Sequence, residues 1–528
     1  MSNPYVSTRH SVYAKHGVVA TSEGLAAQVG LDILKRGGNA IDAAVATAAA
    51  LTVVEPTSNG IGSDNFALVY FQNQLHGMNA SGWSSQNISI DKVKARGYET
   101  MPSFGVVPIT VPGTPKGWAR LIERFGTMSL LEVLQPAIDL ARYGFAISET
   151  VGYYFERAIA VYQKRNTTPE FQHFFDVFTK AGQPYRAGDI FQSDDLADTL
   201  EEIGRTNADS LYTGPLANKI VSFMNRYGGF LDKEDLAGFD VEFVEPISTL
   251  YHGYDVCEIP PNGQGITALM GLNLLRDESL TQGDVITYHN QIEAIKIAFS
   301  DTMRYVTDPK FMAMNPDYLL SDAYVTKRKP DIKDKAQVHN PIEYASSGTV
   351  YLATADNDGN MVSLIQSNYM GFGSGIVIDG TGLSMQNRGH TFQLDPDHPN
   401  ALAPRKRTYH TIIPGFLMKD GLPIGPFGVM GGFMQPQGHL QVVMNLIDFQ
   451  MNPQAALDAP RFRWDSGLTV ALEDTMNPRI IAGLNERGHD VKVEPRGSGF
   501  GRGQIILKKE DCYEVGTETR CDGHIAYY

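Results

Sequence analysis

The chain has 528 residues, of which 42% are hydrophobic and 20% are charged, and its formal net charge is −15. This composition is typical of a soluble globular protein that can bury a large core without disulfides or metals. The acidic balance argues against binding to a nucleic-acid backbone, which needs a concentrated basic surface.

Cysteine usage and apolar runs indicate the compartment. The three cysteines, Cys257, Cys512 and Cys521, are a low, odd number that suits a reducing compartment. Cys512 and Cys521 could still pair across a short hairpin. The N-terminus lacks the apolar core of a signal peptide, and no run of about 18 apolar residues predicts a membrane span. We therefore expect a cytoplasmic protein with neither a membrane nor a nucleic-acid partner.

The first half of the chain is mainly helical in pattern. Apolar residues recur at helical spacing over 22–35. Asn39 can cap a second, largely apolar helix at 40–54, with Asp42 in its first turn. Alternation at 66–71 predicts a strand. Further helical patterns lie at 112–205 and near 215–227, 266–276 and 286–304.

The second half has a different character. The polar segment 308–341 lacks clear periodicity, and we interpret it as an exposed connection. Beyond it, two β-rich runs at 350–355 and 361–367 flank the turn sequence Asp356-Asn357-Asp358-Gly359-Asn360. The other expected elements are strands at 411–418 and 423–429 and helices at 436–447, 453–458 and 476–487. Helices first and a β-rich end, neither with its own evident core, predict a layered α+β fold.

The residues Gly348 and Thr349 mark the candidate nucleophile. Small residues precede a threonine that opens a strand. If the Gly348–Thr349 bond is cut, Thr349 gains an α-amine, which titrates near ~7.7–8.0. Nucleophile and general base then belong to one residue. A threonine at a strand start is more often structural, because β-branched residues favour strands.

The sequence resembles the γ-glutamyltranspeptidase family over nearly its whole length. That family's precursors cleave themselves before a threonine and fold as four-layer αββα N-terminal-nucleophile hydrolases. Counting back from Asp358-Gly359-Asn360 without gaps places the family nucleophile on Thr349. The matching stretches are 17–20, ILKRGGNAIDAAVA (33–46), 112–114, PPNGQG (260–265), DNDGN (356–360), FGSGI (372–376), GVMGG (428–432), NPQAALDAPRFRW (452–464) and 522–523.

The resemblance implies a self-cleaved protein with the fragments 1–348 and 349–528, which remain paired. It implies cleavage of a γ-glutamyl (glutathione-type) or similar small-molecule amide through an acyl-Thr349 intermediate, with no cofactor. No His, Cys or Asp cluster shows metal-ligand spacing in the sequence, so we expect no metal. Whether the protein forms a homo-oligomer stays open.

Three more positions acquire catalytic roles through the resemblance. Ser367 matches a hydroxyl residue that supports the nucleophile, although serine also favours strand ends for structural reasons. Gly431 and Gly432 match a backbone oxyanion hole, where glycine lets N–H groups approach a developing negative charge. A phosphate cradle is the other interpretation of these glycines, but no Lys-Ser/Thr pair follows them.

The expected substrate pocket departs from the family pattern. Thr391 stands where the family has an acidic residue for the substrate's α-amino group, and 79–83 lacks the family's arginine for the α-carboxylate. His410 and Thr411 replace a pair of serines. Arg388 either pairs with an acidic group on the substrate or bridges loops.

These substitutions leave several functions open. A zwitterionic glutamyl group would lose two charge-assisted hydrogen bonds, each commonly contributing ~1.5–3 kcal/mol. The hypothesis is therefore a branch that acts on a γ-glutamyl-like or dicarboxylic acyl amide, as related glutaryl (cephalosporin) acylases do. An unprocessed, inactive relative that only binds ligands is the alternative from another class.

Overall fold

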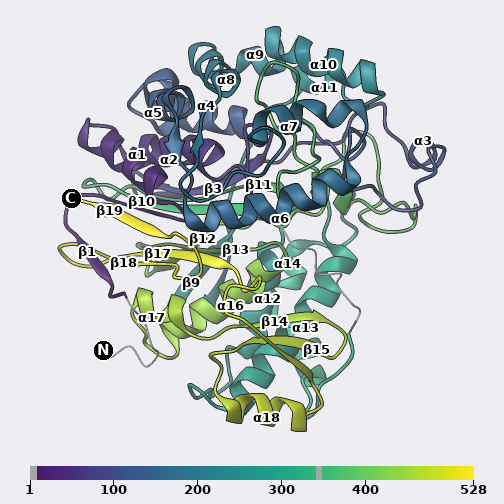
Figure 1. The fold of residues 1–528 in the computed structure, drawn as a ribbon. Coiled ribbons are helices and arrows are strands. Elements are labelled where there is room, and N and C mark those ends of the chain that lie inside the picture. Colours follow the sequence, from purple (N-terminus) through teal and green to yellow (C-terminus); the bar gives the residue numbers. More distant parts are fainter. Residues whose placement is uncertain (1–8, 340–347) are drawn as a thin grey trace.

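Two seven-stranded sheets face each other at the centre of the protein, and the computed structural model describes residues 9–339 and 348–528 (Figure 1). The first sheet runs in the order β1 (Val12–Ala14), β18 (Tyr513–Thr517), β17 (Arg502–Lys508), β13 (Leu422–Met430), β12 (Gly415–Lys419), β9 (Tyr254–Glu258) and β8 (Ile247–Tyr251). The second runs in the order β19 (His524–Tyr527), β2 (Val18–Thr21), β10 (Gly348–Ala355), β11 (Met361–Tyr369), β3 (Asp64–Phe71), β4 (Gln74–Ala80) and β7 (Glu242–Val244). Each sheet therefore takes strands from both sides of Thr349.

Helices cover the outer face of each sheet and complete four layers (Figure 1). The layer on the second sheet includes α1 (Gly24–Lys35), α2 (Ala40–Val54), α4 (Thr114–Phe125), α5 (Leu130–Tyr143), α6 (Glu149–Arg165) and α8 (Asp194–Arg205). The layer on the first sheet includes α12 (Gly265–Leu275), α13 (Val285–Tyr305), α16 (Met434–Ile447) and α17 (Pro453–Asp458). The αββα sandwich expected from the sequence is confirmed.

The core follows these layers. One apolar cluster lies between the two sheets and includes Phe66 from β3 and Tyr351 from β10. Two larger clusters lie between each sheet and its helices. Helix α2 is buried along its whole length, which explains why its sequence is apolar on every face. The Asn39 side chain caps α2 by accepting from the backbone N–H groups of Ile41 and Asp42.

The segment at 308–341 differs from its expected form. Much of it folds into short helical turns. Leu319, Tyr324 and Val325 are buried in the core of the helical layer that covers the first sheet. These turns are too short for their apolar residues to show a helical period, so they could not be predicted from the sequence. They are η2 (Pro309–Phe311), α14 (Pro316–Leu319), α15 (Asp322–Arg328) and η3 (Lys329–Asp331). Residues 340 and 341 lie outside the described residues.

A third, three-stranded sheet adjoins the C-terminal half. It consists of β14 (Phe462–Ser466), β15 (Thr469–Glu473) and β16 (Asp490–Glu494), with α18 (Pro478–Glu486) beside it. The cysteines Cys257, Cys512 and Cys521 are all free thiols, so the hairpin disulfide considered above does not form. Among the described residues, no helix combines the length and apolar character needed to cross a membrane.

Candidate active site

Thr349 is the second residue of β10, and its side chain is completely buried. Strand β10 pairs antiparallel with β11, and their register shifts between Gly348 and Val350. Thr349 therefore lies at an irregularity of the ladder. Bulges of this kind re-aim a side chain, and they recur beside active sites.

The Ser367 hydroxyl joins Thr349 to the preceding peptide bond. Ser367 Oγ lies 3.0 Å from Thr349 Oγ and donates a hydrogen bond to the Gly348 carbonyl oxygen at 2.7 Å. It also accepts from the Tyr369 N–H at 2.8 Å. A serine hydroxyl has only one proton, so Thr349 must be the donor in the contact between the two hydroxyls. The result is a directed chain from Thr349 Oγ through Ser367 Oγ to the Gly348 oxygen.

Gly348 fits its site only without a side chain. A Cβ atom there would lie 2.9 Å from Gly371 N, from Ser58 Cα and from Thr57 O. All three are backbone atoms, which cannot turn aside as a flexible side chain would. The peptide bond before Thr349 is thus enclosed by backbone on several sides.

Gly431 and Gly432 form the turn between β13 and α16, and strand β13 packs across β10. Their φ angles are +141° and +61°, a region that favours glycine. The Gln264 side chain fixes this turn by donating to Gly432 O at 2.8 Å and to Thr411 O at 2.6 Å. The two glycines carry no side chain of their own over this buried backbone, and an oxyanion hole needs such close approach to main-chain N–H groups.

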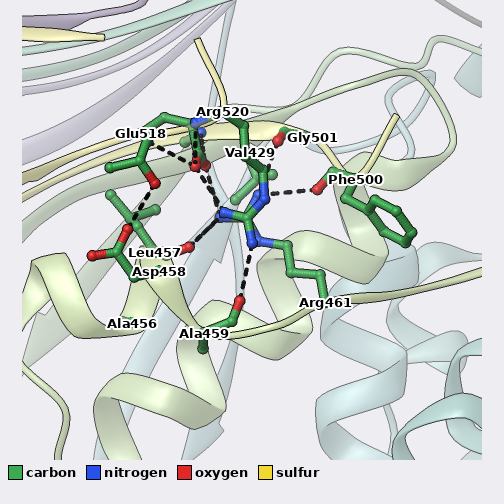
Figure 2. A network of polar contacts seen from close by, with 12 residues as sticks. Val429, Ala456, Leu457, Asp458, Ala459, Arg461, Phe500, Gly501, Glu518 and Arg520 are labelled. Carbon is green, nitrogen blue, oxygen red and sulfur yellow. Dashed lines mark hydrogen bonds and ion pairs between the residues drawn. The ribbon is translucent and has the colours of Figure 1, made fainter. Parts of the chain in front are cut away.

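A buried charge network surrounds Arg461 and reaches the backbone of Phe500 and Gly501 (Figure 2). Arg461 Nη1 donates to the carbonyl oxygens of Phe500 and Gly501, both at 3.0 Å, and Arg461 Nη2 pairs with Glu518 at 2.9 Å. A Cβ atom on Gly431 would lie only 3.3 Å from Gly501 Cα. The loop that Arg461 holds is therefore the one against which Gly431 packs.

The His410 imidazole pairs with Asp64, a residue that the sequence analysis did not single out. Asp64 begins β3 directly opposite Ser367 in the neighbouring strand. Its Oδ2 atom lies 3.0 Å from His410 Nε2, and both residues are fully buried. Burial lowers the pKa of His410 well below its ordinary value, with further contributions from Arg388 and Arg407. His410 is therefore neutral and donates its Nε2–H to Asp64.

The same carboxyl group is near Arg388. Arg388 Nε lies 3.8 Å from Asp64 Oδ2, and Arg388 Nη1 donates to Thr411 Oγ1 at 2.7 Å. The guanidinium carbon lies 4.6 Å from the centre of the Tyr369 ring. Burial raises the pKa of Asp64 to about 7, although Arg388 opposes that shift. Burial also lowers the pKa of Arg388 to about 10, so this side chain is a cation at neutral pH.

The Thr391 hydroxyl is used inside the protein. It donates to Arg388 O at 2.8 Å and lies 2.7 Å from the Thr408 hydroxyl. Of the four expected substrate-binding residues, Arg388, His410 and Thr411 come together around Asp64, whereas Thr391 closes the turn that carries Arg388.

Comparison with known proteins settles the family. The model of the family described as gamma-glutamyltranspeptidase matches residues 26–528. The chain belongs to the γ-glutamyltranspeptidase family. It is 36% identical over 496 residues to the glutathione hydrolase-like YwrD proenzyme of Bacillus subtilis (strain 168), covering 92% of each chain. It is 32% identical over 530 residues to the acylase ACY 1 proenzyme of Pseudomonas sp. (strain SE83), covering 96% of this chain and 92% of that one.

Among solved structures, this γ-glutamyltranspeptidase family member resembles a cephalosporin acylase from Bacillus halodurans. The two are 53% identical with a TM-score of 0.97, and the match covers 100% of this chain and 98% of the other.

One further polar cluster could not be predicted from the sequence, because its residues are far apart along the chain. The fold brings His289, Glu293 and His489 within reach of a common point. Their polar atoms are already engaged, because the two imidazoles bond to each other at 2.8 Å and Lys296 Nζ lies 2.8 Å from Glu293 Oε1. Lys296 Nζ also lies 3.5 Å from His489 Nδ1, so this buried amino group contacts two of the three candidate ligands.

Proposed function

We propose that the chain is a proenzyme that cleaves itself between Gly348 and Thr349 and then uses Thr349 to hydrolyse an amide. The observation that carries this proposal is the hydroxyl chain from Thr349 Oγ through Ser367 Oγ to the Gly348 oxygen. Thr349 Oγ attacks the Gly348 carbonyl carbon while Ser367 stabilises the charge that develops on its oxygen. The proton of Thr349 Oγ passes to the Thr349 nitrogen as the Gly348–Thr349 C–N bond breaks, which leaves an ester that water then hydrolyses.

The freed α-amine of Thr349 acts as the general base in the second reaction. It accepts the proton of Thr349 Oγ as the hydroxyl attacks the substrate carbonyl, and it returns a proton to the leaving amine. The Gly431 and Gly432 N–H groups stabilise the oxyanion, a contribution of about 2.7–4 kcal/mol for each donor in comparable enzymes. Water completes the cycle by attacking the acyl-Thr349 ester. We therefore propose hydrolysis in preference to transfer of the acyl group to an amine.

The substrate's acyl group carries a carboxylate in this proposal. Arg388 is a buried cation that stacks on Tyr369 of β11. Thr391 stands where the family has an acidic residue for an α-ammonium group, and its hydroxyl bonds the protein's own backbone. A dicarboxylic or γ-glutamyl-like amide fits this charge. The names of the relatives, a cephalosporin acylase and a glutathione hydrolase-like protein, support the same class of acyl group.

The fragments 1–348 and 349–528 stay together after cleavage because both sheets contain strands from each of them. Strand β10, which starts at the cleavage site, lies between β2 and β11. Separating the fragments would break the backbone ladder and expose the core between the sheets, so the cut does not release either piece.

Matched substrates test this function. The purified protein should hydrolyse glutaryl-p-nitroanilide, and Thr349→Ser should retain part of that activity while Thr349→Ala retains none. A rate on the γ-glutamyl anilide that exceeds the glutaryl rate overwhelmingly would refute the assignment of the dicarboxylic class. Activity in Thr349→Ala would refute the nucleophile.

A further inference from the structure

Arg388 has hydrogen-bonding capacity that the protein does not use. Among the described residues, its Nε and Nη2 atoms are buried without a hydrogen-bond partner, whereas Nη1 is bonded to Thr411. Nε and Nη2 form one edge of the guanidinium plane, and such an edge binds a carboxylate through two parallel hydrogen bonds. A buried arginine with this edge uncommitted points to an anionic ligand.

Asp64 lies beside that edge without covering it. Its Oδ2 atom is 3.8 Å from Arg388 Nε, which is too long for a hydrogen bond. The carboxyl group is held instead by the His410 Nε2–H at 3.0 Å and by the Gly82 N–H at 3.1 Å. A ligand carboxylate on the Arg388 edge would therefore bind next to a second, fixed carboxyl group.

We infer that Asp64 is a specificity-determining residue that makes the binding of an acidic acyl group proton-linked: the two carboxyl groups share Arg388 and one proton taken up from solvent. This inference rests on the proposed function, because it places the substrate's carboxylate at Arg388. The proton is required because two adjacent buried carboxylates do not both ionise against one cation.

Among the described residues that act on Asp64, the other cation is Arg407, which lowers the pKa of Asp64 but is committed to other partners. His410 is neutral, and its Nδ1 accepts from the Ile412 N–H at 3.4 Å. Arg407 is paired with Glu242 at 2.6 Å and donates to Ser81 O. The Tyr212 phenol is buried and its pKa is raised, mainly by burial, so it does not add a charge. Asp64 itself already has a pKa raised to about 7 by burial, so it accepts a proton readily.

The consequence is a characteristic pH dependence. Above pH 7 the free site has lost the proton that the complex needs, so the dissociation constant of an acidic ligand should rise about tenfold per pH unit. Asp64→Asn keeps the shape of the side chain but removes the second negative charge. This variant should bind the same ligand more tightly than the wild type at pH 8.5, and without dependence on pH.

Calorimetry on the processed protein with glutarate as the probe tests the inference. Titrations at pH 8 in two buffers of different ionisation enthalpy should show uptake of about one proton by the wild type and none by Asp64→Asn. Absence of glutarate binding, binding without proton uptake, or equal uptake in Asp64→Asn would overturn it. The wild-type measurement decides the matter even if Asp64→Asn fails to fold.

The failure of this inference and the failure of the proposed function are distinguishable. Self-cleavage and anilide hydrolysis that depend on Thr349 test the function without reference to Asp64. A processed, active protein that binds glutarate without proton uptake would overturn only the role of Asp64.

Discussion

The hydroxyl groups of Thr349 and Ser367 lie 3.0 Å apart on adjacent antiparallel strands, at the point where the ladder between them is irregular. Ser367 uses its single proton to bond the Gly348 oxygen at 2.7 Å. The proposed nucleophile, the proposed polarising donor and the peptide bond proposed for cleavage are therefore connected through two hydrogen bonds.

Ser367→Ala should slow self-cleavage by about 10²–10³-fold, because it removes the donor to the Gly348 oxygen. Ser367→Thr keeps the hydroxyl and should process at a rate closer to that of the wild type. The measurement is the disappearance of the full-length band on a denaturing gel over time. Ser363→Ala is the matched control, since Ser363 is buried in the same strand but bonds Tyr351 at 2.8 Å. Equal rates for Ser367→Ala and Ser363→Ala would contradict this role.

Gly348→Ala should accumulate the precursor. The added methyl group would meet three backbone atoms at 2.9 Å, so the backbone at Gly348 must shift, and its 2.7 Å hydrogen bond with Ser367 is disturbed. Gly24→Ala controls for a general effect of losing a glycine, because a Cβ there has only ordinary contacts with His524 at 3.8 and 3.9 Å. Intact-mass spectra of the two freshly purified variants give the comparison, and normal processing of Gly348→Ala would show that its contacts are unimportant.

Arg461→Lys should lower kcat about 10–10²-fold with little change in KM, because lysine has one nitrogen in place of two: Nη1, which bonds Phe500 O and Gly501 O, and Nη2, which pairs with Glu518. The loop that contains Phe500 and Gly501 would then hold the turn at Gly431 and Gly432 less firmly. Steady-state kinetics on glutaryl-p-nitroanilide separate the two parameters. Lys492→Met serves as the control, since Lys492 forms only an exposed pair with Asp490. A change confined to KM would place Arg461 outside this role.

Glu23→Gln should stabilise the protein at pH 8 and leave its stability nearly unchanged at pH 4. Burial raises the pKa of Glu23 from 4.5 to about 7, with a smaller contribution from Glu55. Between these values the folded state binds more protons than the unfolded state, so stability falls as pH rises. The neutral glutamine avoids a cost of about 1–3 kcal/mol at pH 8. Thermal unfolding at both pH values measures the difference.

Glu132 provides a control, because its pKa is shifted in the opposite direction to that of Glu23. Glu132 is exposed, and its pKa is lowered by hydrogen bonds from the Ser129 hydroxyl and backbone. Glu132→Gln should therefore give no gain at pH 8. A gain for Glu132→Gln as large as that for Glu23→Gln would show that the effect comes from net charge and not from burial.

Helices and strands whose ends are marked by capping or turn residues could be predicted from the sequence. Asn39 and Asp42 mark the start of α2 because they bond to its first turn, and the expected helix at 40–54 matches α2 in both bounds. The turn at 356–360 predicts the hairpin of β10 and β11 for the same reason. Strand order was not predictable, because β2, β10 and β19 pair across most of the chain length.

The candidate site could be predicted only in part, because its charges come from distant segments. Thr349, Ser367 and the pair of glycines follow from motif matching, and the structure connects the first two directly. Asp64 could not be singled out, since a carboxylate at the start of a strand has no sequence signal for the histidine 346 positions away that bonds it. Burial of Asp64, which depends on the packed sheets, is what raises its pKa.

The most direct test of the central claim is the intact mass of the active protein, combined with sequencing of its internal N-terminus. We expect two polypeptides that remain associated, the second beginning Thr349-Val350-Tyr351. Active protein that consists of one uninterrupted polypeptide through Gly348 and Thr349 would contradict it.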